Sequence, residues 1–169
     1  MPGNIFLIGF MGAGKSTIAR TLHKRLGYPV VEMDERIVKE QGMSINDIFA
    51  KYGEDAFRDM ESQLILTLGE EEPSIVSCGG GIILRDCNTE YMKRSGKVIY
   101  LTATPETVYA RVRTSTNRPV LNGNMNVEYI AQLMEKRRAR YEAAADAAVA
   151  TDGRTQEEIC EEILHNLGV

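Results

Sequence analysis

Short runs of consecutive apolar residues alternate along the chain with longer stretches in which apolar residues recur at helical spacing. Strands that are covered on both faces have such continuous apolar runs. The predicted strands are residues 4–8, 29–33, 74–78, 97–102 and 147–151. Because strands and helices alternate, the pattern predicts an α/β fold in which helices cover both faces of a parallel sheet.

The ends of several helices are marked by capping residues. The helical pattern of residues 15–26 stops at Gly27, and a glycine after the last turn is a common helix end. Helix starts are predicted at Ser44, at Thr104 and at Thr155. Two further helices are predicted over residues 54–68 and 126–145, which makes strand–helix alternation continuous along the chain.

Composition and charge limit the classes of protein to which the chain can belong. The chain has 169 residues, 43% apolar and 26% charged, enough for one globular domain with a substantial core. The net charge of −4 argues against a general nucleic-acid or membrane-surface binder. Three cysteines without CxxC spacing are typical of reduced thiols in a cytoplasmic protein. We expect no signal peptide and no membrane span, because no apolar run approaches about 20 residues.

The strongest chemical signal follows the first predicted strand. Residues 9–17 (GFMGAGKST) fit the pattern G-x-x-x-x-G-K-[ST], between a strand and a helix. Backbone N–H groups of such a glycine loop converge on phosphate oxygens. Lys15 neutralises charge on the β- and γ-phosphates, and the Ser16 hydroxyl is a ligand for Mg²⁺. The motif predicts a site for a nucleoside triphosphate with Mg²⁺; the alternative is a tight turn that happens to be rich in glycine.

Acidic residues end only one predicted strand, residues 29–33, where Glu32 and Asp34 lie two positions apart. If the strand persists that far, both side chains project to the same side of it. One carboxylate can then serve the metal and the other a substrate hydroxyl. In the alternative interpretation Asp34 is the N-cap of a helix that follows it, and the two interpretations are compatible.

A second glycine cluster, Gly79, Gly80 and Gly81, follows the predicted strand 74–78. Glycines at this place allow a ligand to lie against the backbone, although a tight turn would explain them equally well. Arg58 precedes Glu61 by three residues, so the carboxylate can hold the guanidinium in place. Taken alone, this pair is typical of an ion pair on a helix surface.

Basic residues gather in the second half of the chain: Arg111, Arg113, Arg118, Lys136, Arg137, Arg138 and Arg140. Arginine is suited to bidentate capture of carboxylate or phosphate. Residues 113–124 (RTSTNRPVLNGN) show no periodicity, and a loop of this size is usually functional or disordered. Within it, Arg118 is a candidate to close over a transferring phosphate. The run 136–140 has the alternative interpretation of a solvated helix face.

Taken together, these motifs resemble those of shikimate kinase. They are the P-loop, the acid-x-Asp strand end, the block GEDAFRDME at residues 53–61, the triple glycine, and RPVL at residues 118–121. The resemblance covers nearly the whole chain. It implies an ATP-dependent kinase for the 3-hydroxyl of shikimate in aromatic amino-acid biosynthesis. It also implies one P-loop domain over residues 1–169, a three-layer fold whose five-stranded parallel sheet is of the nucleoside-monophosphate-kinase type, with strand order 2-3-1-4-5.

The resemblance also assigns roles to residues. The implied catalytic residues are Asp34, as the base, and Lys15 and Arg118, at the transferred phosphate. The implied shikimate-binding residues are Asp34, Arg58, Gly79, Gly80, Gly81 and Arg137. The implied ATP-binding residues are Gly12, Ala13, Gly14, Lys15, Ser16, Thr17, Arg111, Arg118 and Arg154. Mg²⁺ is assigned to Ser16 and, through water, to Glu32 and Asp34. We expect a substrate-binding region over about 34–62, a lid over about 113–124, and a cytoplasmic monomer without nucleic-acid or membrane partners.

One position departs from the family pattern, because Glu32 stands where aspartate is usual. The longer side chain must fold back or displace a metal-bound water, so metal affinity or preference is expected to differ. Activity should persist because Asp34 is retained. The alternatives are a gluconate-kinase-like or nucleoside-monophosphate-kinase-like enzyme of the same fold and, from another class, a nucleotide-controlled binding module without turnover.

Overall fold

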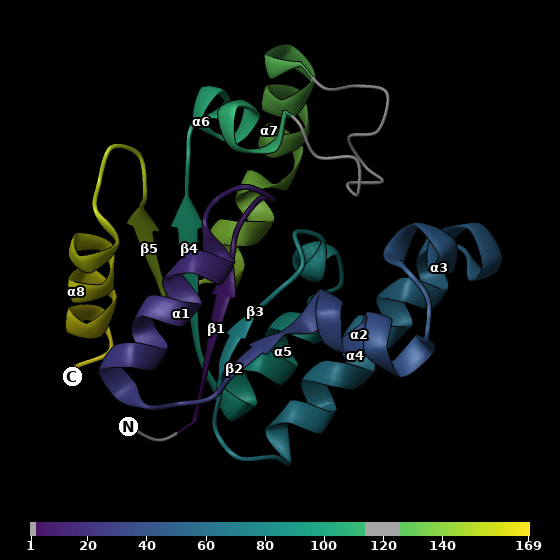
Figure 1. Ribbon diagram of the computed structural model, residues 1–169, viewed down its shortest axis with the longest axis horizontal. Helices are drawn as coiled ribbons and strands as arrows, with labels where there is room; N and C mark the ends of the chain where they lie inside the picture. Colours follow the sequence, from purple (N-terminus) through teal and green to yellow (C-terminus); the bar gives the residue numbers. More distant parts are fainter. Residues whose placement is uncertain (1–2, 114–125) are drawn as a thin grey trace.

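A five-stranded parallel sheet forms the centre of the molecule (Figure 1). The structure is a computed structural model, and it describes residues 3–113 and 126–169. Within these residues the strand order is β2-β3-β1-β4-β5, which confirms the predicted order and fold class. The strands are β1 (Asn4–Ile8), β2 (Val30–Glu32), β3 (Ile75–Ser77), β4 (Gly96–Thr102) and β5 (Ala147–Ala150). Parallel pairing brings the carboxyl ends of all five strands to one edge, where ligands of such sheets bind.

Helices cover both faces of the sheet (Figure 1). They are α1 (Lys15–Leu26), α2 (Met33–Gln41), α3 (Ile45–Tyr52), α4 (Glu54–Gly69), the 3₁₀ helix η1 (Ile82–Leu84), α5 (Asp86–Ser95), α6 (Pro105–Val112), α7 (Val127–Ala144) and α8 (Gln156–Asn166). Among the described helices, none combines the length and apolar character that crossing a membrane requires.

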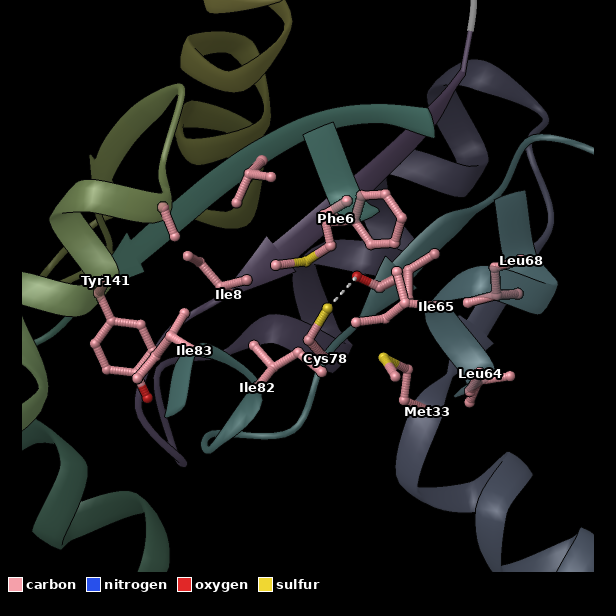
Figure 2. Close-up of a cluster of buried hydrophobic side chains, with 14 of the residues drawn as sticks. Phe6, Ile8, Met33, Leu64, Ile65, Leu68, Cys78, Ile82, Ile83 and Tyr141 are labelled. Carbon is pink, nitrogen blue, oxygen red and sulfur yellow. Dashed lines mark hydrogen bonds between the residues drawn. The ribbon is translucent and has the colours of Figure 1, made fainter. Parts of the chain in front are cut away.

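The two faces of β1 lie in different hydrophobic clusters because strand side chains alternate. Ile5 and Leu7 pack with residues of α1 and α8. Phe6 and Ile8 pack with residues of α2, α4 and α5 on the other face (Figure 2). A third cluster, which includes Phe10, packs the loop after β1 against α6 and α7. Each face of the sheet therefore has its own core, and a third cluster lies under α6 and α7.

The structure corrects the predicted end of the second strand. The strand stops at Glu32 and α2 begins at Met33, so Asp34 lies in the first helical turn and Glu32 is the N-cap. Neither the strand continuation nor the cap at Asp34 is right. β2 is an edge strand whose last partner in β3 is Ser77, the residue at which β3 itself ends. The ladder therefore has no partner for Met33.

Most predicted helix ends are confirmed by their caps. Ser44 accepts a hydrogen bond from the Asp47 N–H at 3.1 Å, and Thr104 accepts one from the Thr107 N–H at 3.3 Å. Thr155 forms a reciprocal capping box with Glu158. The first predicted strand matches β1, the third extends one residue beyond β3 at each end, and the fourth and fifth differ from β4 and β5 by one residue at one end. The predicted helix over 126–145 is α7 with Asn126 as its N-cap.

Candidate active site

A pocket of about 200 Å³ opens at the carboxyl edge of the sheet. Its walls come from the loop after β1, the start of α1, the junction of β2 and α2, and the segment after β3. The lining residues are Met11, Gly12, Gly14, Lys15, Ser16, Thr17, Glu32, Asp34, Ser77, Cys78, Gly79 and Gly80. Most of the predicted phosphate-binding and metal-binding residues thus share one cavity with the first two glycines of the second cluster.

Glycine is required in the loop after β1 for two separate reasons. Gly12 and Gly14 have φ angles of 80° and 99°, in the left-handed region that other residues rarely adopt. A Cβ atom at Gly12 would also lie 2.8 Å from Val112 Cγ1 on α6. Gly14 is the N-cap of α1, so the N–H groups of the first helical turn face the cavity with the positive end of the helix dipole. This is the geometry of an anion site.

Lys15 lies across the same loop. Its Nζ donates to the carbonyl oxygens of Gly9 at 2.6 Å and Phe10 at 3.1 Å. The ammonium is therefore held at the cavity by the backbone that surrounds it, beside the N-terminus of α1. One fixed cation and a set of backbone N–H groups converge on the same space.

Oxygen atoms suited to a hard cation gather on the wall beside Lys15. Ser16 Oγ donates to Glu32 Oε2 at 2.9 Å, and it lies 3.4 Å from Ser77 Oγ. The carboxylate of Asp34 lines the same pocket. This hydroxyl and carboxylate set fits Mg²⁺, which is usually held by one or two carboxylates together with phosphates and water. Among the described residues there is no cluster of three His, Cys, Asp or Glu that would form a self-contained metal cage.

Arg58 is not a surface residue, contrary to what its spacing to Glu61 alone indicates. Only 6% of it is exposed, and Nη1 donates to Glu61 Oε1 at 2.8 Å. Glu54 adds a second, longer contact of 3.3 Å at the start of α4. A guanidinium that is buried in this way is held by its own helix and points to the interior side of α4.

Glu61 is itself fully buried, and burial raises the pKa of its carboxyl to about 7 although the Arg58 guanidinium opposes the shift. Asp34 lies near enough to raise the pKa further. Among the described residues, Glu61 Oε2 has no hydrogen-bond partner. This part of the site therefore contains a carboxyl that titrates close to neutral pH.

Charged side chains approach the backbone of the triple glycine closely. A Cβ at Gly79 would lie 2.8 Å from Glu61 Oε2 and 3.0 Å from Asp34 Oδ1, and one at Gly81 would lie 2.6 Å from Arg58 Nη2. Larger residues would displace the charged groups that meet there. The glycines are therefore needed for contact with side chains, and a tight turn alone does not explain them.

Arg137 reaches the same glycines from α7. It is 6% exposed, and its guanidinium lies 5.9 Å from the centroid of the Phe10 ring. The neighbouring Tyr141 hydroxyl donates to the Gly80 carbonyl oxygen. In contrast, Arg138 is exposed and paired with Glu135. The interpretation of 136–140 as a solvated face holds for Arg138 and is wrong for Arg137.

The two arginines predicted on the adenine side, Arg111 and Arg154, lie in different surroundings. Arg111 Nη1 donates to the Gly12 carbonyl oxygen at 2.8 Å, so it belongs to the rim of the P-loop. Arg154 instead pairs with Glu162 at 2.8 Å and donates to the Ala150 carbonyl oxygen, away from the residues that line the pocket. Arg118 and all of the predicted lid 113–124 except Arg113 lie outside the described residues.

Sequence reasoning missed two contributors, Ser77 and Tyr141. Ser77 interrupts the apolar run of β3 directly opposite Glu32, a signal that becomes visible only once the strands are in register. Cys78, which also lines the pocket, is buried, and burial raises the pKa of its thiol well above the usual range, which disfavours the reactive thiolate.

Comparison with known proteins identifies relatives over almost the whole chain. A family model described as shikimate kinase matches residues 11–168. A shikimate kinase of Thermodesulfovibrio yellowstonii is 40% identical over 161 residues, which cover 95% of this chain and 92% of that protein. One from Dehalococcoides mccartyi is 42% identical over 163 residues, 96% of this chain and 92% of that protein. The structure of the Acinetobacter baumannii shikimate kinase in complex with shikimate is similar with a TM-score of 0.93 at 30% identity, over 99% of this chain and 93% of that one.

Proposed function

This chain belongs to the shikimate kinase family, and on that premise we propose how its pocket divides between ATP and shikimate. The enzyme transfers the γ-phosphoryl group of ATP to the 3-hydroxyl of shikimate, a step of aromatic amino-acid biosynthesis. The observation that supports the division is the burial of two guanidiniums, Arg58 and Arg137, against a glycine run that borders the P-loop pocket.

The nucleotide occupies the P-loop side. Backbone N–H groups of residues 12–17 hold the phosphates, Lys15 neutralises the charge that develops on transfer, and Arg111 extends the site toward the base. Arg118 is proposed as a further cation at the transferred group, and Arg154 as a residue of the adenine side. Because phosphoryl transfer needs little covalent assistance, fixed charge and placement supply most of the catalysis.

The acceptor occupies the glycine side. We assign its carboxylate to Arg58 and Arg137, and one face of its ring to the backbone of residues 79–81. Asp34 orients the attacking hydroxyl and accepts its proton late in the transfer. The acceptor region then corresponds to residues of about 34–62 together with the glycines and α7.

Mg²⁺ is proposed as the metal because the oxygen donors beside Lys15 fit it. Ser16 Oγ would bind it directly, and the carboxylates of Glu32 and Asp34 would act through water. When bound, the ion supplies positive charge to the β- and γ-phosphates. Glu32 meanwhile orients the Ser16 hydroxyl by accepting its hydrogen bond, so the longer acid still reaches the serine.

We further propose that the enzyme is a cytoplasmic monomer of one domain. The competing assignments, a gluconate-kinase-like or nucleoside-monophosphate-kinase-like enzyme, have the same fold but lack the support of the family match. A module without turnover is disfavoured for the same reason.

A coupled assay of ADP release tests the proposal. Shikimate, gluconate and a panel of nucleoside monophosphates are compared as acceptors, with ATP alone as the blank. We expect release with shikimate only, lost when Arg58→Ala or Arg137→Ala is assayed at the same shikimate concentration. Turnover of shikimate that is indifferent to both substitutions would contradict the assigned acceptor site.

A further inference from the structure

A fully buried asparagine, Asn88 in α5, connects two parts of the acceptor site. Its Nδ2 donates to the Ile82 carbonyl oxygen at 2.9 Å, and its Oδ1 accepts from Ser62 Oγ at 2.7 Å. Buried polar groups are normally satisfied in this way, so the bonds alone are ordinary. The positions of the two partners give these hydrogen bonds a further role.

Each partner is close in sequence to a residue that we assign to acceptor binding. Ser62 follows Arg58 by one turn of α4, and the Ser62 hydroxyl oxygen is 3.1 Å from the Arg58 carbonyl oxygen. Ile82 follows Gly81 directly and begins η1, and its N–H donates to the Gly79 carbonyl oxygen at 3.1 Å. The Asn88 amide therefore joins the helix that carries Arg58 to the turn that ends the glycine run.

The spacing between these two parts has little tolerance. The Arg58 guanidinium lies so near Gly81 that even one added carbon atom would be 2.6 Å from Nη2. A shift of α4 along η1 would therefore move Arg58 relative to the glycine backbone. Arg137 is fixed separately, because Tyr141 of the same helix bonds to Gly80. The two Asn88 bonds instead join the glycine run to the helix that carries Arg58.

We propose that Asn88 is a positioning residue for the acceptor: it sets the place of Arg58 against residues 79–81 without touching the substrate. The inference rests on the proposed assignment of Arg58 to the shikimate carboxylate. Its effect should appear in the KM for shikimate, because a clamp that is displaced in the free enzyme weakens acceptor binding.

The chain contains a matched control in Asn4, another buried asparagine that ties α4 to its surroundings. Asn4 is 3% exposed, its Nδ2 donates to the Leu68 carbonyl oxygen at 3.3 Å, and its Oδ1 accepts from the Ser74 N–H at 2.7 Å. These bonds lie at the opposite end of α4, at the start of β1 and β3. Both asparagines support the fold, but only Asn88 is next to the acceptor site.

The experiment compares Asn88→Ala with Asn4→Ala in steady-state kinetics and urea unfolding. Both variants should lose stability. Asn88→Ala should raise the shikimate KM about tenfold, while Asn4→Ala should change it less than about twofold, and the KM for ATP should stay within about twofold in both. Ser62→Ala, which removes the partner hydroxyl and keeps a good helix former, should raise the shikimate KM about threefold and decides the matter if Asn88→Ala does not fold.

A double-substitution cycle separates this inference from the function on which it rests. In an Arg58→Ala background, Asn88→Ala should add no further rise in shikimate KM, because the group that it positions is gone. Equal KM effects of the two asparagine variants, or an undiminished Asn88 effect without Arg58, would overturn the inference. An unchanged shikimate KM in Arg58→Ala itself would instead overturn the assignment of Arg58.

Discussion

The proposed nucleotide side and the proposed acceptor side of the pocket are built in opposite ways. The nucleotide side is almost one continuous segment, in which backbone N–H groups and Lys15 surround a space at the start of α1. The acceptor side is collected from α2, α4, the glycine run and α7, and its main groups are buried charges. One side is local and made of backbone, whereas the other is long-range and made of side chains.

This difference has an energetic consequence. Backbone groups at a helix N-terminus are already unpaired, so placing them at a ligand costs the fold little. Buried guanidiniums and carboxylates lose solvation and must be compensated by partners, as Arg58 is by Glu61. Changes on the nucleotide side should therefore affect catalysis with little effect on acceptor binding, while changes on the acceptor side should also affect stability.

The largest expected effect comes from Lys15→Ala. It removes the fixed cation from the nucleotide side, so kcat should fall by about 10³-fold or more. Shikimate binding, measured by calorimetry, should stay within about twofold because the groups assigned to the acceptor come from other elements. A comparable loss of shikimate affinity would show that the two sides bind their ligands as one unit.

Arg137→Ala should have the next largest effect, on the acceptor side alone. The loss of one partner of a buried charge contact costs about 2 kcal/mol or more, so we expect the shikimate KM to rise about 30-fold or more. The KM for ATP should change little. Arg138→Ala is the matched control on the same helix, because its side chain is exposed and paired with Glu135, and it should leave both constants nearly unchanged. Similar kinetics for the two variants would contradict the role of the buried arginine.

The sequence predicts the nucleotide side, which is local, well and the acceptor side, which depends on long-range contacts, poorly, for a physical reason. The first strand and the P-loop helix are predicted at their observed bounds, because an apolar run, a glycine motif and Gly27 fix them locally. The place of Asp34 is missed, because the end of β2 is set by the length of its neighbour β3. Residue spacing does not contain that information.

Burial is the other quantity that local patterns do not give. Arg58 with Glu61 looks the same in sequence as a surface pair, and Arg137 lies in a run of basic residues whose neighbour Arg138 is exposed. Only the resemblance to a family separates them. The connection through Asn88 has no sequence signal, because it depends on how α5 and α4 pack. The role of Ser77 becomes visible only once β2 and β3 are in register.

Glu61 provides a test of the electrostatic cost of the acceptor side. Its carboxyl has a pKa raised to about 7 by burial, so between about pH 4.5 and 7 the folded protein binds a proton that the unfolded chain has lost. This stabilisation is complete below about pH 4.5 and is lost as the pH rises to about 7. The free energy of unfolding from this group should therefore fall across that range by on the order of 1–3 kcal/mol.

Glu61→Gln has no such proton to lose, and it should flatten this part of the pH profile in urea unfolding between pH 4.5 and 8. Glu135→Gln is the control, because Glu135 is an exposed carboxylate whose pKa is lowered by Arg138. A profile for Glu61→Gln that is parallel to the parent protein would mean that Glu61 is ionised throughout the range, and that charge burial costs the acceptor side less than proposed.

The smallest expected effect concerns Glu32, where the nucleotide side takes a group from a distant strand. Glu32→Gln keeps the side-chain length and an oxygen that accepts from Ser16, but it removes the negative charge near the proposed Mg²⁺. ADP binding in the presence of Mg²⁺ should weaken by a few-fold, on the order of 1 kcal/mol, while ADP binding without Mg²⁺ should not weaken. Calorimetric titrations with and without Mg²⁺ measure both, with Glu35→Gln as the control on the exposed side of α2. If the ratio of the two affinities does not change, Glu32 acts only by orienting Ser16, and the nucleotide side is more completely local than the proposed metal site implies.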